Sequence, residues 1–317
     1  MDIVNKLELH YYFDDESHSI DAHIRNKCES ELLAIISEAA AYLGIEIHID
    51  AEALREGGIK NNWKLTSKNI ALLSLFLSII TAVLSRYPPS DEELDKLKKT
   101  DIQLSIKERE LNIAKLNKEL TLGVPASETV EAVVDSVNNN FKIITRKSNL
   151  YKNFTHCHKL NKVGFSKLND ENCAIGDESY VNRNEFIKFY LHVDELPPLI
   201  IDDAVIEIIS PVLKEGTYKW KGIYNGEPIS FTMLDSEFKF NVLTKKISFQ
   251  HGTSIECVLR NYRKLDELGD IVSKGYAAET VLAKMDSSIS VETPQGRRYK
   301  YNKMQAESQG KLFSKDE

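Results

Sequence analysis

The sequence predicts an α+β protein with a small N-terminal βαβ cap, one hydrophobic (transmembrane) helix, a long helical stalk and a C-terminal small β-barrel or rolled sheet. Three observations predict this order. Residues 69–85 carry no charge in a chain in which 28% of the residues are charged. Residues 90–122 are rich in Glu and Lys and carry apolar residues at helical spacing. From residue 204, short apolar runs alternate with turn signals, which is typical of strands.

Length and composition limit the class of protein. The chain has 317 residues and a net charge of −7, so it can form more than one core and is not a globally basic nucleic-acid-binding protein. Four cysteines without a repeated spacing favour reduced thiols. We expect a βαβ cap (1–60), a hydrophobic transmembrane helix (66–86), an amphipathic stalk helix (90–122), a basic helical region (126–200), a β domain (204–285) and a mobile tail (286–317).

The first segment has the pattern of a strand, a helix and a second strand. Residues 3–13 alternate apolar and polar side chains, and the acids that follow supply a cap for a helix from about residue 18 to residue 43. Gly44 is expected to end this helix, because glycine readily adopts the left-handed conformation found there. Residues 45–50 alternate again and predict the second strand.

Two groups of residues have the donor types of a metal site. One is an acidic and histidine-containing run near the N-terminus, in which His18 and Asp21 share a helical face. The same residues are also those that cap and open a helix, and we favour that interpretation. The other group lies between residues 156 and 173. It has no Cys-x-x-Cys pair, so we predict no metal site there. The two groups are Asp14, Asp15, Glu16, His18, Asp21 and His23, and His156, Cys157, His158 and Cys173.

The uncharged segment 69–85 predicts a membrane span of marginal length. A helix of this length covers about 26 Å, slightly less than the ~30 Å hydrocarbon layer of a bilayer. Small and hydroxylated residues at steps of three and four form one face, which we predict to line a pore or to pack against other helices. A buried core helix is the alternative. The face consists of Ala71, Ser74, Ser78, Thr81 and Ser85.

The stalk segment carries two apolar seams on different helical faces. Ser90 is a suitable N-cap, and acids follow it in the first turn. A helix with two seams needs two neighbours, so we expect either a coiled-coil contact between subunits of a homo-oligomer or packing within the chain.

A basic and aromatic stretch lies between residues 138 and 169, where no acidic residue occurs. Cations with neighbouring aromatic rings are typical of sites for nucleotides or single-stranded nucleic acid. Lipid headgroups or water are the alternatives. The predicted ligand-binding residues are Lys142, Arg146, Lys147, Lys152, Phe154, Lys159 and Lys162.

The β domain contains an Asn225-Gly226 hairpin turn, and Tyr218, Trp220 and Tyr224 alternate with lysines. Small barrels often bind oligonucleotides on one face. We find none of the usual catalytic or phosphate-binding motifs, so we predict a protein that is not an enzyme and has no cofactor.

In organisation, the chain resembles the single-span effectors of bacterial anti-phage defence, including those of Hailong type. This resemblance implies a homo-oligomeric ion channel in the bacterial inner membrane, with the C-terminal region in the cytoplasm. It also implies antiviral defence, a nucleotide or short single-stranded nucleic acid as ligand, and a nucleotidyltransferase-type partner protein.

Two other hypotheses fit the sequence. The first is a soluble or peripherally attached scaffold or binding protein that uses the apolar helix as an interface. The second is a nuclease or other metal enzyme that uses Asp14, Asp15, His18 and Asp21.

Overall fold

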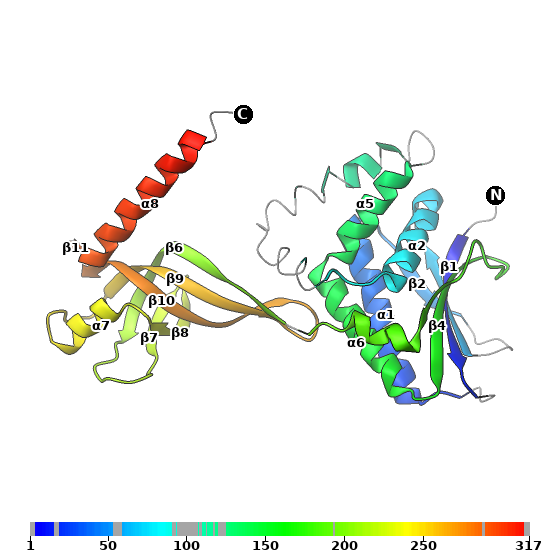
Figure 1. Ribbon diagram of the computed structural model, residues 1–317, viewed down its shortest axis with the longest axis horizontal. Coiled ribbons are helices and arrows are strands. Elements are labelled where there is room, and N and C mark those ends of the chain that lie inside the picture. Colours follow the sequence, from blue (N-terminus) through cyan, green and yellow to red (C-terminus); the bar gives the residue numbers. More distant parts are fainter. Residues whose placement is uncertain are drawn as a thin grey trace. The chain divides into compact units, whose positions relative to one another are not determined.

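The structure is a computed structural model that divides into two compact units (Figure 1). It describes residues 4–15, 19–52, 59–90, 125–192, 194–286 and 289–313, with some positions between 93 and 119. The first unit comprises Met1–Asp194 and Leu265–Asp270, and the second comprises Glu195–Lys264 and Ile271–Glu317.

A five-stranded antiparallel sheet organises the first unit. Its order is β2-β3-β1-β4-β5, and the strands are β1 (Val4–Phe13), β2 (His48–Ala51), β3 (Ile59–Thr66), β4 (Leu160–Asn169) and β5 (Ser179–Asn182). The predicted cap and the predicted basic region therefore share one sheet, because β4 pairs with β1.

The two faces of this sheet differ in chemistry. Along β1, Leu7, Leu9 and Tyr11 are buried in the core, as expected for alternate residues of a strand. Polar side chains occupy the other face, where Lys6 pairs with Glu52 at 2.7 Å. Such ion pairs satisfy the charges that the strand places outside the core.

Helices pack on the apolar face of the sheet and share one core with it (Figure 1). Asp21 caps the first helix by accepting from the backbone N–H groups of His23 and Ile24, so this helix begins a few residues later than predicted. Gly44 ends it at a φ of 67°, as predicted. The helices are α1 (Ala22–Leu43), α2 (Ile70–Ser85), α5 (Ser127–Asn138), α6 (Phe141–His156) and the 3-10 helix η1 (Arg183–Phe189).

The prediction of a transmembrane helix is wrong. Among the described residues, no helix is both long and apolar enough to span a bilayer. Helix α2 has 16 residues, and Leu73, Phe76 and Ile80 are buried between the sheet and the other helices. The ion channel and the inner-membrane location, which depend on a span, are corrected with it. Hydropathy was misleading because a helix surrounded by core has the same composition as one surrounded by lipid.

Three hydroxyl groups of α2 donate hydrogen bonds within the helix. Ser78 donates to the carbonyl of Ser74, Thr81 to that of Leu77, and Ser85 to that of Thr81. Lys167 on β4 donates to the Ser78 hydroxyl at 2.9 Å. Three hydroxyls of the face that was predicted to line a pore therefore have hydrogen-bond partners inside the first unit.

The prediction of a long helical stalk is also wrong for the part of the chain that the structure describes. The longest helix described is α1, with 22 residues. Most of the segment 90–122 lies outside the described residues. Within it, Leu116 is buried in the core of the first unit, and Glu119 accepts a hydrogen bond from the backbone of Ala126.

The second unit contains the predicted small barrel. Its elements are β6 (Glu195–Ser210), β7 (Trp220–Tyr224), β8 (Glu227–Met233), α7 (Ser236–Leu243), β9 (Thr253–Leu265), β10 (Ile271–Asp286), β11 (Ile289–Glu292) and α8 (Pro294–Phe313). Five strands close in the order β6-β7-β8-β10-β9, because β9 pairs with both β10 and β6. Strands β8 and β10 are parallel, and α7 connects β8 to β9. This is the arrangement of the oligonucleotide/oligosaccharide-binding (OB) fold.

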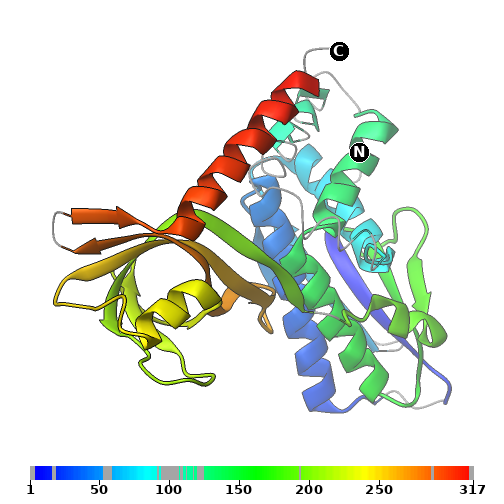
Figure 2. The same cartoon turned by 60° about the vertical axis from the view of Figure 1, so that its left-hand side comes forward.

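Aromatic residues fill the barrel around the side chain of Trp220. Trp220, Phe231 and Phe238 are fully buried, and the ring centroids of Trp220 and Phe249 lie 5.6 Å apart. The Asn225-Gly226 turn joins β7 and β8 with positive φ at both residues, as predicted. Figure 2 shows the barrel strands beside α7 (yellow), with α8 (red) leading away from them. Residues that were predicted to form a mobile tail include β11 and α8.

Candidate functional site

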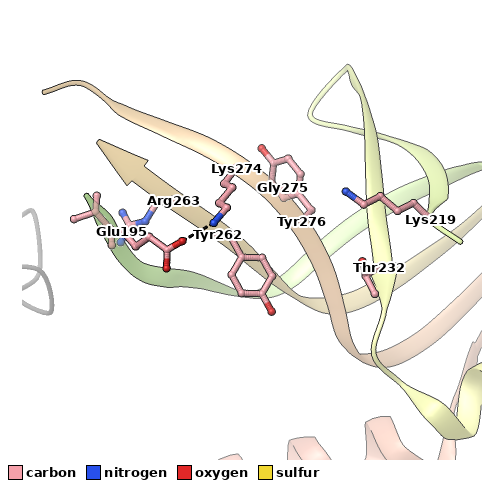
Figure 3. Close-up of a pocket in the computed structure, with 9 residues that line it drawn as sticks. Glu195, Lys219, Thr232, Tyr262, Arg263, Lys274, Gly275 and Tyr276 are labelled. Carbon is pink, nitrogen blue, oxygen red and sulfur yellow. Dashed lines mark hydrogen bonds and ion pairs between the residues drawn. The ribbon is translucent and has the colours of Figure 1, made fainter. Parts of the chain in front are cut away.

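A cavity of about 250 Å³ in the second unit combines cations with tyrosine rings (Figure 3). Its cationic side chains are Lys219, Arg263 and Lys274, and its tyrosines are Tyr262 and Tyr276. Glu195, Leu196, Thr232 and Gly275 complete the lining.

Strand pairing brings these residues together from distant parts of the sequence. Lys219 precedes β7, Thr232 lies on β8, and Arg263 lies near the end of β9. Tyr276 on β10 pairs with Phe231 on β8, which places it beside Thr232. The cavity therefore lies between the connection that enters β7 and the β9–β10 hairpin.

The charges at this cavity are unequal, since three cations face one carboxylate. Lys274 Nζ lies 2.5 Å from Glu195 Oε1, and this hydrogen bond lowers the pKa of the Glu195 carboxyl. Arg263 donates to the Pro197 carbonyl, with Nη2 at 3.1 Å. This contact holds the guanidinium against β6. The remaining positive charge suits an anionic ligand.

The tyrosines give the cavity its apolar surface. Tyr262 is 38% exposed, and Tyr276 is half-buried with its ring centroid 6.2 Å from that of Tyr224. Tyr218, beside Lys219, is 57% exposed. Accessible aromatic rings next to cations can stack on planar groups whose phosphates the cations bind.

Two of the ligand-binding residues predicted from the sequence are buried in the first unit. The side chain of Lys147 is fully buried and donates to the Arg86 carbonyl and to Asn138 Oδ1, both at 2.6 Å. Burial, and then the nearby charge of Arg86, lowers the pKa of Lys147 to about 7. Phe154 is buried against Tyr151. Both residues contribute to the core.

Two further predicted residues, Lys142 and Arg146, line a different cavity, of about 280 Å³, in the first unit. Lys142 Nζ lies 2.9 Å from Asp270 Oδ1 and 3.8 Å from Glu38 Oε2, and Arg146 pairs with Glu31 at 3.1 Å. Carboxylates therefore already surround both cations.

Each of the last three predicted cations lies over different aromatic rings. Lys152 lies over the ring of Tyr190, and Lys159 lies over the ring of Phe13. Lys162 lies between two rings, 4.2 Å from the centroid of Tyr12 and 4.9 Å from that of Tyr180. The structure thus does not bring the predicted set into one site.

The described residues of the two possible metal sites do not converge on one position. Asp21 is the N-cap of α1, and hydrogen bonds from the backbone of Ile24 and His23 lower its pKa. Cys157 is buried at the end of α6, whereas Cys173 is exposed. Glu16 and His18 lie outside the described residues. Among those that are described, no three His, Cys, Asp or Glu side chains converge.

Most residues of the barrel cavity were not predicted from the sequence, although the sequence carries a signal for them. Tyr262-Arg263 and Lys274-Gly275-Tyr276 both combine a cation with a tyrosine, and they flank the short connection 265–270. A hairpin through this connection brings the two groups together. Lys219 and Thr232 join them only when the barrel closes, which these local signals in the sequence do not predict.

Comparison with known proteins found no family model, no curated protein and no solved structure that matches the chain. A function is therefore inferred from the chemistry of the cavity.

Proposed function

We propose that this chain is a binding protein whose barrel holds a nucleotide or a short single-stranded nucleic acid. The observation that supports this most is the cavity that Lys219, Arg263 and Lys274 line together with two tyrosines. The sequence predicted a membrane channel with an oligonucleotide ligand, and of these two features only the ligand is kept here. The proposed protein is a binding protein, like the alternative hypothesis from the sequence, but α2 is not its interface.

The cations would bind phosphate, and the tyrosines would stack on bases. Arg263 suits phosphate because its planar guanidinium donates several hydrogen bonds in fixed directions. A base stacked on an aromatic side chain contributes about 1–3 kcal/mol and requires no particular sequence. A ligand phosphate would compete with Glu195 for Lys274.

The position of the cavity supports the same ligand. OB-fold proteins bind oligonucleotides on the face of their second and third strands and at the connections between strands one and two and between four and five. Here Lys219 ends the first of these connections, Thr232 lies on the third strand, and Arg263 and Lys274 flank the second connection.

The test is fluorescence anisotropy with a labelled single strand of about ten nucleotides, which matches the site size of an OB fold. The full chain is titrated at several salt concentrations. We expect Lys219→Gln to weaken binding of all sequences and to reduce the salt slope by about one phosphate contact.

Lys246→Gln is the matched control. Lys246 follows α7, away from the second and third strands, is exposed and does not line the cavity. The variant therefore removes the same charge without changing the site. Failure of the wild-type chain to bind the strand or a mononucleotide at low salt would contradict the proposal, as would equal losses in the two variants.

A further inference from the structure

The connection between β9 and β10 is a hydrogen-bonded turn that belongs to the first unit. We call Leu265–Asp270 the hairpin tip. Asp266 Oδ1 accepts hydrogen bonds from the backbone N–H groups of Leu268 and Asp270, both at 2.9 Å, and its own N–H donates to the Asp270 carbonyl. Gly269 has a φ of 82°, where glycine is favoured. The tip therefore holds its shape by local bonds.

The hairpin tip lies directly against α6. A Cβ atom on Gly269 would lie 2.6 Å from Lys142 Cα and 3.0 Å from the Phe141 carbonyl oxygen. Because these are backbone atoms of α6, they cannot move aside without distortion of the helix. Only glycine fits at this contact.

Polar bonds hold the same contact on both sides. Asp270 Oδ1 lies 2.9 Å from Lys142 Nζ, and this hydrogen bond raises the pKa of Lys142. Asn149 Nδ2, two turns further along α6, donates to the Glu267 carbonyl at 3.0 Å. Leu265 is buried and its N–H donates to the Asp194 carbonyl. The two ends and the centre of the tip are therefore fixed.

The tip joins the two strands that carry Arg263 and Lys274. We propose that Gly269, Asp270 and Lys142 are positioning residues for the nucleotide ligand, because docking of the tip fixes the hairpin from which Arg263 and Lys274 extend. This inference rests on the proposed function. A free hairpin would have to be ordered on binding, and ordering each long side chain lowers affinity by roughly twofold to tenfold.

The experiment compares two variants of the tip with two matched controls in the anisotropy assay. Gly269→Ala introduces the backbone clash. Gly176→Ala is its control, since Gly176 has a φ of 80° but a Cβ atom at this position would have no neighbouring atom within 4 Å. Asp270→Asn removes the bond to Lys142, and Asp177→Asn removes the same charge at an exposed position in the first unit.

We expect both tip variants to bind the labelled strand roughly twofold to tenfold more weakly than their controls, with an unchanged salt slope. The salt slope distinguishes the two roles: loss of a cation that contacts phosphate, as in Lys219→Gln, makes the slope less steep, whereas loss of a positioning residue leaves it unchanged. Removal of the negative charge of Asp270 should by itself strengthen binding of an anionic ligand. Weaker binding by Asp270→Asn would therefore not be explained by the change in net charge.

Hydrogen exchange at residues 262–264 and 271–275 provides a second readout, and we expect faster exchange in Asp270→Asn. If Gly269→Ala does not fold, Asp270→Asn and its control decide. If the wild-type chain binds and the tip variants bind as their controls do, the inference is wrong while the proposed function stands. If the wild-type chain does not bind, the proposed function is wrong and the inference falls with it.

Discussion

The buried Lys147 should make the stability of the chain depend on pH in a predictable direction. Its pKa is about 7 in the folded chain and 10.5 in a solvated lysine. Between these values the unfolded chain binds a proton that the folded chain does not. The free energy of unfolding therefore rises with pH from about 7 to about 10.5, and this lysine contributes no slope below pH 7.

The size of this effect follows from the shift. Each unit of pKa corresponds to about 1.4 kcal/mol, so the full difference is on the order of 5 kcal/mol. Lys147→Met keeps the length of the side chain and removes the titrating group. It also leaves the Arg86 carbonyl and Asn138 Oδ1 without this donor, which lowers stability by about 1–3 kcal/mol per group at any pH.

Urea unfolding at a series of pH values from 6 to about 10.5 measures the difference. We expect the wild-type curve to rise more steeply than that of Lys147→Met, because the other groups that titrate in this range are common to both. Lys152→Met, on the same helix but only half-buried, should follow the wild-type slope. Parallel curves for the wild type and Lys147→Met would refute the reasoning from burial.

Two further predictions concern stability and use the same urea measurement. Ile80→Ala on α2 should lower the free energy of unfolding by about 2–5 kcal/mol, because Ile80 is fully buried, whereas Ile70→Ala should change it by less than about 0.5 kcal/mol, because Ile70 is 51% exposed. Equal small effects would show that α2 is not a core helix. Asp235→Ala should lower the free energy of unfolding by about 2–4 kcal/mol, because this buried carboxylate accepts hydrogen bonds from the backbone of Phe238 and Val281 and from the Gln295 side chain. Asp203→Ala, at an exposed position of β6, should leave the free energy of unfolding nearly unchanged. A loss of similar size in both variants would contradict this role for Asp235.

Local signals in the sequence predicted the parts of the fold that depend on neighbours in the chain. The Asn225-Gly226 turn, the end of α1 at Gly44 and the alternation along β1 are examples, because each needs only a few adjacent residues. The position of β4 was not predictable in this way, because its partner in the sheet is β1, far earlier in the chain.

The structure does not bring the predicted ligand-binding residues into one site, for a geometric reason. Composition identified a basic and aromatic stretch but not the directions of its side chains. Lys142 and Lys147 are five residues apart on α6, which places them about 140° apart around the helix. One therefore meets Asp270 at the surface and the other is buried. The cations of the barrel cavity come from three separate elements, and only strand pairing brings them together.

The path of the chain through the hairpin tip affects how the protein can be divided. A fragment that stops at residue 194 contains every strand and helix of the first unit but lacks Glu267, Gly269 and Asp270. Lys142 and Asn149 would then lose partners that the intact chain provides. No single cut separates the two units cleanly, because a cut near residue 194 leaves the six residues of the hairpin tip, which belong to the first unit, on the C-terminal piece.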